Sequence, residues 1–403
     1  MKLDLVDDLD CDSDGIEPSD KAFDAVNTIN EPLELIVPPG IYRFGETHTF
    51  DRREDLRLIA ERGNARFRPP DGTDREWLRF ECDTHIANID IDRHADETSP
   101  TITIAARRRA LIENMIVEGV DDVPDRDLPV FDVRMDNPRS DVVFRNLRFP
   151  ARSGSVTSKS VVGRAGIGAG SLNYGTITLE DCIVEECSGP GVDVGQSVGE
   201  LRVKGGRYAN NADTQINLSQ PSSRVDGATV VVDPASAVSA SVSDYDRLSG
   251  IDVGAPPTSD DASGEIVDSD VRVASGDASI VDAGIYGTKN AQHSEIRGTD
   301  VRVDPANVPA IQFDAPERET PDPEIDYSVD IFDVVCAGTS RSGDAVVIDR
   351  RPKSEIRETC IETPGERQPY RFTPKAAVKS NLSQVQTTES CDFFRGPLQQ
   401  NDS

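Results

Sequence analysis

The chain has 403 residues and is strongly acidic: 73 acidic residues face 43 basic ones, for a formal net charge of −30. Eight of the basic residues are Lys and the rest are Arg. This charge would repel a phosphate backbone, which argues against nucleic acid as a partner. An acid-rich, Lys-poor surface is what a protein needs in concentrated salt, where a Debye length of about 3 Å screens self-repulsion. We therefore expect a halophilic source, a salt-adapted archaeon or its virus.

Residues 1–45 predict a loop, a helix and a strand. Ser19 is placed to cap a helix whose apolar residues share one face: Ala22, Phe23, Val26 and Ile29. Pro38-Pro39-Gly40 predicts a tight turn between two strands. A helix at this point would cover the open first coil of a solenoid.

The first residues show neither the apolar core of a secretion signal nor a twin Arg, and no later apolar run reaches membrane-spanning length. The expected location is therefore cytoplasmic, or extracellular on a virion, in a high-salt environment, and no membrane span is expected.

From residue 86 onward, short strands with alternating apolar residues recur at intervals of roughly 22–42 residues, with Asn, Asp or Gly at their corners. Two successive copies stand in 172–218. Other copies lie at 86–89, 111–116, 142–147, 225–228, 266–271, 296–301, 329–334 and 356–361. Strands this short cannot bury a face alone, but stacked coils can. The prediction is an all-β parallel β-helix; an antiparallel sandwich is the alternative.

The repeat divides the chain into three expected parts: an N-terminal cap at 1–45, coils at 46–363, and a C-terminal cap or tail at 364–403. Segments rich in Gly, Pro, Ser or Asp interrupt the coils at 151–171, 234–264 and 314–325. Long inserts of this kind extend from the edge of a solenoid and often line a groove.

The opening of the chain resembles the pectate-lyase-like β-helix superfamily. The resemblance rests on the acidic, Gly-containing loop at 6–15, the short helix, and the strand–Pro-Pro-Gly–Tyr turn that ends at Tyr42. With its acidic composition, the chain as a whole resembles the β-helix repeat proteins of haloarchaea. The superfamily includes pectate lyases, polygalacturonases and viral tailspikes. The resemblance implies a right-handed β-helix, a polysaccharide or cell-surface glycan as partner, and, by likeness to tailspikes, a homotrimer.

The superfamily's catalytic motifs are largely missing. Polygalacturonases carry Asp-Asp together with Gly-His-Gly; Asp-Asp occurs at 7–8, 121–122 and 260–261, but Gly-His-Gly does not occur. A lyase would need Ca²⁺ on carboxylates and an Arg base, and otherwise no cofactor or metal is expected. Weak candidates for such a site are Asp181, Glu185, Asp193, Asp213, Arg145, Arg164 and Arg202.

A glycan-binding surface is expected in the middle of the chain, where polar and aromatic side chains recur. The candidates are Tyr174, Asp193, Tyr208, Asn210, Asn211, Asp213 and Gln215. In the alternative interpretation, Asn210 and Asn211 are corner residues that tolerate the left-handed conformation, and Tyr208 belongs to the core.

Other residues favour structural roles. Trp77 is expected to pack under the cap rather than serve as a sugar platform, because Leu78 and Phe80 are also apolar. Seven Cys without a C-x-x-C motif argue against a full disulfide framework. Cys182 and Cys360 fit small buried positions, and Arg107–Arg109 and Arg350-Arg351 fit solvated corners.

Two functions follow as hypotheses. The first is a glycan-binding attachment protein of spike or adhesin type. The second is a salt-adapted polysaccharide lyase or glycoside hydrolase, and whether the chain is an enzyme is left open.

Overall fold

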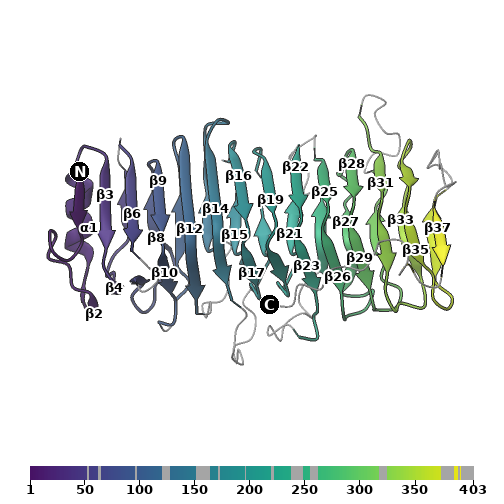
Figure 1. The fold of residues 1–403 in the computed structure, drawn as a ribbon, viewed down its shortest axis with the longest axis horizontal. Coiled ribbons are helices and arrows are strands. Elements are labelled where there is room, and N and C mark those ends of the chain that lie inside the picture. Colours follow the sequence, from purple (N-terminus) through teal and green to yellow (C-terminus); the bar gives the residue numbers. More distant parts are fainter. Residues whose placement is uncertain are drawn as a thin grey trace.

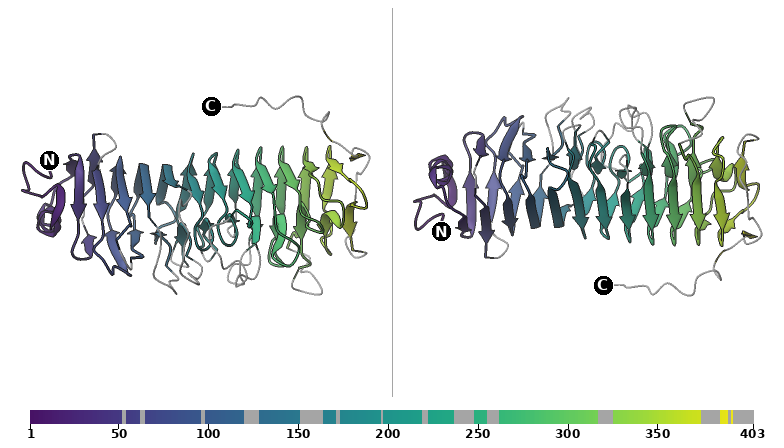
Figure 2. Two further views of the ribbon diagram at one scale, coloured as in Figure 1. Left: turned by 90° about the horizontal axis from the view of Figure 1, so that it is seen from below. Right: turned by 90° about the horizontal axis from the view of Figure 1, so that it is seen from above.

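The computed structural model describes residues 1–51, 54–61, 65–95, 98–119, 128–150, 164–170, 173–195, 197–218, 222–236, 248–254, 262–316, 325–373, 385–388 and 391. Over these residues the chain winds into an elongated right-handed parallel β-helix with a helix at its N-terminal end (Figure 1). The predicted fold class is therefore confirmed. Views from above and below show the coils stacked along a single axis (Figure 2).

Each coil contributes one strand to each of three faces, and strands pair in parallel with those of the next coil. The first face consists of β1 (Lys2–Asp4), β3 (Leu33–Val37), β6 (Leu56–Ala60), β9 (Thr84–Ala87), β12 (Arg109–Glu118), β14 (Asp141–Phe149), β16 (Thr176–Glu180), β19 (Leu201–Lys204), β22 (Ser223–Asp226), β25 (Gly264–Val267), β28 (Ser294–Arg297), β31 (Val329–Phe332) and β34 (Glu355–Arg357).

The long strands β12 and β14 begin on the first face, bend around the corner and continue on the second face, so they belong to both. The other strands of the second face are β2 (Asp14–Pro18), β4 (Gly40–Arg43), β7 (Ala65–Arg68), β10 (Ile89–Asp92), β17 (Ile183–Glu185), β20 (Arg207–Ala209), β23 (Thr229–Val232), β26 (Asp270–Val273), β29 (Asp300–Val303), β32 (Val335–Ala337), β35 (Cys360–Glu362) and β37 (Gln386–Thr388).

The third face is a separate sheet of twelve strands. They are β5 (His48–Phe50), β8 (Glu76–Phe80), β11 (Thr101–Ile104), β13 (Phe131–Val133), β15 (Ile167–Ala169), β18 (Val192–Asp193), β21 (Ile216–Leu218), β24 (Leu248–Val253), β27 (Val281–Gly287), β30 (Ile311–Phe313), β33 (Asp344–Ile348) and β36 (Gln368–Phe372).

The corner between the first and second faces explains the Asn, Asp and Gly of the sequence repeat. Residues there take φ values between 48° and 68° in successive coils: Asn88, Asn114, Asn146, Asp181, Gly205, Gly227, Asp268, Gly298, Asp333 and Glu358. Gly, Asn and Asp adopt this left-handed conformation at least cost. Stacked corners also bond to one another, since Asn146 Nδ2 donates to Asn114 Oδ1 at 3.0 Å.

The helix α1 (Asp20–Thr28) covers the first coil and buries Ala22, Phe23 and Val26. The Phe23 ring lies 4.7 Å from that of Phe44, and Trp77 lies 5.2 Å from Phe44 on its other side. Trp77 is buried, which confirms that it packs under the cap.

The N-terminus of α1 is fastened by Asp20 rather than by the expected Ser19. Ser19 occupies the N-cap position, but its side chain caps no backbone N–H. The Asp20 carboxylate instead accepts from the backbone N–H groups of Gly45 and Glu46, at 3.0 and 3.1 Å, and His48 Nε2 lies 2.6 Å from its Oδ1. These contacts join the helix to the corner that precedes β5.

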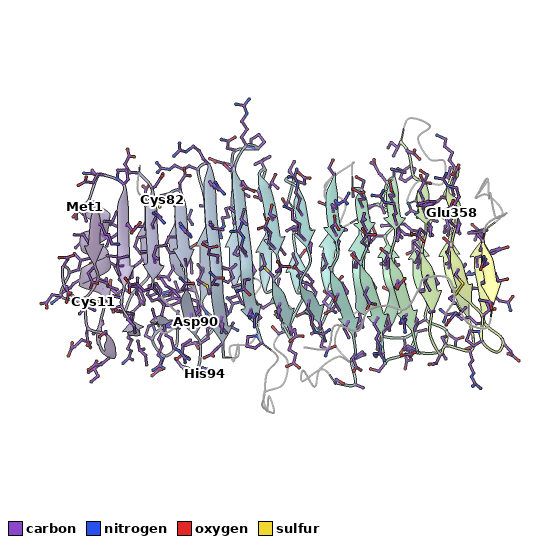
Figure 3. The ribbon with its side chains drawn as sticks, in the orientation of Figure 1. Met1, Cys11, Cys82, Asp90, His94 and Glu358 are labelled. Carbon is purple, nitrogen blue, oxygen red and sulfur yellow. A yellow bond between two sulfur atoms is a disulfide. The ribbon has the colours of Figure 1, made fainter. Side chains whose placement is uncertain are left out.

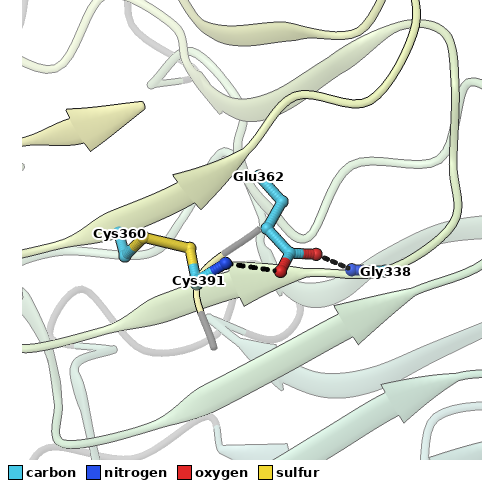
Figure 4. The surroundings of a disulfide bond; sticks show 4 residues. All are labelled: Gly338, Cys360, Glu362 and Cys391. Carbon is cyan, nitrogen blue, oxygen red and sulfur yellow. Dashed lines mark hydrogen bonds between the residues drawn. A yellow bond between two sulfur atoms is a disulfide. The ribbon is translucent and has the colours of Figure 1, made fainter. Parts of the chain in front are cut away.

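At the other end, the parallel pairing continues beyond the expected last coil at residue 363. Strand β36 pairs with β33, and β37 pairs with β35. A disulfide joins Cys360 to Cys391, and Glu362 accepts from the backbone N–H groups of Cys391 and Gly338 at 2.8 and 2.9 Å (Figure 4). The expectation that Cys360 is only a small buried residue was therefore incomplete.

The three predicted inserts lie largely outside the described residues and stay predictions. Two of them were given too wide a range, because the third-face strands β15 and β24 lie inside 151–171 and 234–264; the third, 314–325, directly follows β30.

Candidate functional site: the outer column of the third face

Polar side chains form a column on the outside of the third face, interrupted by Gly168. Parallel register places one residue per coil in this outer column: Asp132, Gly168, Asp193, Asn217, Asp252, Tyr286 and Gln312. Each follows an inward-facing apolar residue, because side chains alternate between the two faces of a strand. Neighbouring members lie on adjacent strands, about 4.8 Å apart.

Hydrogen bonds connect the column along the rod. Asn217 Nδ2 donates to Asp193 Oδ1 at 3.2 Å, and the Gly195 N–H donates to the same oxygen at 2.9 Å. Further along, the Tyr286 hydroxyl donates to Asp314 Oδ2, and Gln312 Nε2 donates to Asp314 Oδ1 at 3.0 Å. The column is thus held in position rather than freely solvated.

Burial among other acids changes the protonation of the column. Desolvation, together with the nearby carboxylates of Asp213, Asp282 and Asp193, raises the pKa of Asp252 to about 8, although a hydrogen bond from Ser249 opposes this rise. Burial likewise raises the pKa of Asp193. The pKa of Tyr286 is raised by burial and by its bond to Asp314. Asp252 is therefore mainly a neutral carboxylic acid at pH 7.

Two of the sequence-predicted residues belong to this region. Asp193 is a member of the outer column, and Asp213 lies at the corner before β21, where its charge acts on Asp252. Tyr174 is 43% exposed, but it lies in the connection between the third and first faces, outside the column.

The burial of three other candidates contradicts a surface role. Tyr208 and Gln215 are fully buried, and Asn211 is 2% exposed. Asn211 Nδ2 donates to Gln215 Oε1 at 2.9 Å, and Asn211 Oδ1 accepts from the Cys187 N–H at 2.9 Å. These amides satisfy backbone groups inside a corner, which is the usual fate of buried polar side chains.

The alternative interpretation is confirmed for Tyr208 as core and for Asn210 as a left-handed corner residue with φ 56°.

The remaining catalytic candidates lie elsewhere. Asp181 occupies the exposed corner between the first and second faces, with φ 52°. The other charged candidates form ion pairs at the surface: Glu185 with Arg207, Arg145 with Glu180, and Arg202 with Glu200.

Arg164 is 1% exposed, and its guanidinium donates to the carbonyls of Leu128 and Pro129, at 2.7 and 3.2 Å, and to that of Pro100 at 2.5 Å. It fastens three successive segments together and is not available as a base.

Arg351 has the same structural role at the opposite edge of the third face. This corrects the expectation that Arg351 sits at a solvated corner. It is fully buried and donates to the carbonyls of Thr288, Ala291, Asp314 and Tyr327. Burial lowers its pKa to about 10. In contrast, Arg107–Arg109 are exposed, as expected.

Sequence reasoning missed Asp252, Tyr286, Gln312 and Asp314. A signal existed: the outer column follows apolar–polar–apolar triplets, such as Val192-Asp193-Val194 and Ile216-Asn217-Leu218. The triplet Ile251-Asp252-Val253 has the same pattern, but it falls within a segment that was expected to be an insert.

Among the described residues, no group of three or more His, Cys, Asp or Glu side chains is arranged to hold a metal ion. Three of the four His lie beside carboxylates: His48 beside Asp20, His85 beside Glu113, and His94 beside Asp92. His94 and Asp90 are labelled in Figure 3, near β10. None of the helices in the described part of the chain is long and apolar enough to cross a membrane.

No family model matches the chain, and no curated protein sequence matches it. Solved structures do match. The A-module of the mannuronan C-5 epimerase AlgE6 of Azotobacter vinelandii superposes with a TM-score of 0.56 at 13% identity, over 96% of this chain and 99% of that one. The PfbA surface adhesin of Streptococcus pneumoniae superposes with a TM-score of 0.52 at 11% identity, over 96% of this chain and 93% of that one. The AlgE4 A-module from A. vinelandii superposes with a TM-score of 0.50 at 13% identity, over 94% of this chain and 99% of that one.

At these identities the likeness concerns the fold alone. The chain shares the right-handed parallel β-helix of these proteins, as its resemblance to the pectate-lyase-like superfamily implied.

Proposed function

We propose that this protein binds a polysaccharide or cell-surface glycan along the outer column, as an attachment protein of spike or adhesin type. The observation that carries the proposal is the column itself, with one hydrogen-bonding side chain in each coil from β18 to β30. Carboxyl, amide and phenol groups are the donors and acceptors that sugar hydroxyls require. A linear polymer lying along the rod would meet a similar group about every 4.8 Å.

The half-buried state of the column supports binding. Asp193, Asn217 and Tyr286 are neither fully solvated nor closed off, so a ligand can reach them. The Tyr286 ring adds an apolar face beside its hydroxyl, a combination that suits amphipathic sugar rings. The order imposed by the hydrogen bonds to Asp314 lowers the entropy that binding would cost.

Proteins of the same fold are compatible with this proposal. One is a surface adhesin, and two are modules of epimerases that act on mannuronan, itself a polysaccharide. We extend the proposal to a halophilic archaeon or its virus, a high-salt location in the cytoplasm or on a virion, and a homotrimer. The net charge of −30 supports the high-salt part of this extension.

A second candidate function, polysaccharide lyase or glycoside hydrolase, is favoured by one observation. A carboxylic acid that keeps its proton near neutral pH can act as a general acid, and the pKa of Asp252 is raised to about 8. Tyr286 is its register neighbour and offers a second group that can carry a proton. In this candidate, Asp252 takes the catalytic role for which the sequence suggested Asp181, Asp193, Asp213 and Arg164.

The test compares binding and cleavage in one experiment. A haloarchaeal envelope polysaccharide is incubated with the full chain at multi-molar salt, and both its retention on the protein and its length are measured. Retention without shortening is expected. Shortening that disappears in Asp252→Asn would establish the second candidate instead, and unsaturated ends would select the lyase.

Two tyrosines provide a matched pair of variants. Tyr286→Ala is expected to weaken retention about tenfold, because it removes a ring and a hydrogen-bonding group from the middle of the column. Tyr174→Ala removes an exposed ring outside the column and is expected to leave retention unchanged. Equal losses in both variants, or retention that survives Tyr286→Ala, would refute binding along the outer column.

A further inference from the structure

A separate hollow lies on the first face, near the N-terminal end of the rod. It has a volume of about 500 Å³ and is bordered by β6, β9 and β12 and by the corners that lead into them. This volume lies within the range of about 300–1,000 Å³ that is typical of small-molecule sites. The outer column is on a different face, so the two regions are distinct.

Register explains how the lining side chains meet. Arg57 on β6, His85 on β9 and Leu111 on β12 are neighbours in one row across the sheet. Arg109 precedes Leu111 by two residues on the same strand, so both side chains leave the same side of the sheet. Leu111 gives the hollow an apolar floor; Arg109 flanks it along β12, and Arg57 lies two strands away, beyond His85.

Both carboxylates that line the hollow are paired with Arg108. Asp83 accepts from Arg108 Nε at 2.6 Å and from the backbone N–H groups of Arg108 and Arg109 at 2.7 and 3.1 Å. Arg108 Nη2 also lies 3.4 Å from Asp55 Oδ1. A single Arg therefore contacts both acids, and with Arg57 and Arg109 the lining holds three guanidinium groups against two carboxylates, an excess of one positive charge.

Arg109 and Arg57 retain binding capacity. The Arg109 side chain makes no ion pair with any described residue, and Arg57 uses only Nη1, at 2.6 Å from Glu34. Asp141 on β14 faces Arg109 in register without forming an ion pair. His85 Nε2 is already paired with Glu113 Oε1, at 2.8 Å. On a chain with a net charge of −30, two such guanidinium groups beside an apolar floor form a local site for an anion.

We propose that this hollow binds an organic anion the size of one or two sugar units. Arg57 and Arg109 hold its carboxylate, sulfate or phosphate group, and its carbon skeleton rests on Leu111. The planar fork of Arg matches the paired oxygens of such groups. The proposal does not depend on glycan binding at the outer column.

Calorimetric titration of the full chain tests the proposal with four probes: digalacturonate, glucose 6-phosphate, inorganic sulfate and the neutral maltose. One-to-one binding is expected for digalacturonate or glucose 6-phosphate, and the tighter of the two identifies a carboxylate or a phosphate as the preferred group. Maltose is expected not to bind. Saturation by inorganic sulfate alone would overturn the proposal, because it would indicate a general anion site without recognition of the organic part.

Variants locate the site. Arg109→Gln and Arg57→Gln are each expected to weaken binding about tenfold, the usual effect of losing a charged hydrogen bond. Arg302→Gln, an exposed Arg on β29 of the second face, is the matched control and should bind as the wild type does.

Added NaCl should weaken binding to the wild type more than to Arg109→Gln. Should Arg109→Gln lose its native circular dichroism spectrum, Arg109→Lys keeps the charge without the fork and is expected to bind with intermediate affinity. Wild-type affinity in both Arg109 and Arg57 variants would overturn the proposal.

Discussion

Asn217 on β21 donates a hydrogen bond of 3.2 Å from Nδ2 to Oδ1 of Asp193 on β18, the residue before it in the outer column. The two are 24 residues apart in sequence and adjacent in space. The Oδ1 atom of Asn217 is buried without a hydrogen-bond partner among the described residues. Each coil of the β-helix thus adds one member to a row that no single coil could form.

This contact predicts a shift in the titration of Asp193. The hydrogen bond from Asn217 favours the charged carboxylate and lowers a pKa that burial has raised. Asn217→Ala should therefore raise the pKa of Asp193 further, which a carbon-detected NMR titration of the carboxyl group can follow. Asn210→Ala, at a corner away from the column, is the control. An unchanged or lower pKa in Asn217→Ala would contradict the assigned bond.

The raised pKa of Asp252 predicts that the free energy of unfolding falls as pH rises. Its pKa is about 8 in the folded protein, above the value of about 3.9 expected when unfolded, so the folded state holds the extra proton between these pH values. Over that window its contribution to the free energy of unfolding declines by at most about 1.4 kcal/mol per pH unit.

Asp252→Asn removes this dependence. Relative to the wild type, the variant should gain stability steadily from about pH 4 to about pH 8, as measured by urea unfolding. Asp270→Asn, on the exposed side of β26, serves as the control. A constant difference between Asp252→Asn and the wild type across this range would show that the carboxyl group is not protonated in the fold.

Arg351 should be essential for stability. Its removal takes a hydrogen-bond donor from four carbonyl groups, those of Thr288, Ala291, Asp314 and Tyr327, although that of Thr288 still accepts from the Ala291 N–H at 3.0 Å. Arg351→Met is expected to cost about 3 kcal/mol or more of the free energy of unfolding. Arg350→Met changes an adjacent, partly exposed side chain and should cost less than about 1 kcal/mol. Similar losses in the two variants would contradict the role of Arg351.

The C-terminal disulfide predicts the outcome of thiol labelling. Alkylation of the denatured, unreduced protein should modify five cysteines, because Cys360 and Cys391 are joined. The bond closes a loop of 31 residues and is expected to stabilise the last coil by about 2–4 kcal/mol. Urea unfolding of Cys391→Ser measures that loss. Labelling of all seven cysteines would rule the bond out.

The net negative charge predicts stabilisation by salt. A formal charge of −30 makes the folded chain repel itself in dilute buffer, and added NaCl shortens the range of that repulsion. The melting temperature should rise steadily from low to multi-molar NaCl. A sucrose series controls for general effects of added solute. A flat or falling melting temperature in NaCl would argue against adaptation to high salt.

Prediction from the sequence succeeded where local chemistry decides the structure. The strands at 176–179 and 201–203, the polar corner at Asp181, and the burial of Trp77 beneath α1 all follow from alternation, corner residues and apolar neighbours. The same reasoning failed for Gln215 and Asn211, because polar side chains at a corner can turn inward to satisfy backbone groups as easily as outward.

The candidate site was only partly predictable. Asp193 and Asp213 were selected, whereas Asp252 and Tyr286 were not, because coils of unequal length hide the register between them. The burial of Arg164 and Arg351 could likewise not be predicted from the sequence, because carbonyl groups from several coils converge on each guanidinium group.

The sequence by itself therefore determined the repeating coil, its corners and its cap, because these depend on residues close together in the chain. Only the tertiary structure decided which polar side chains share the outer column, which Arg side chains are buried, and which two cysteines meet. Those relationships depend on stacking between coils, and stacking is set by parallel register across the whole length of the helix.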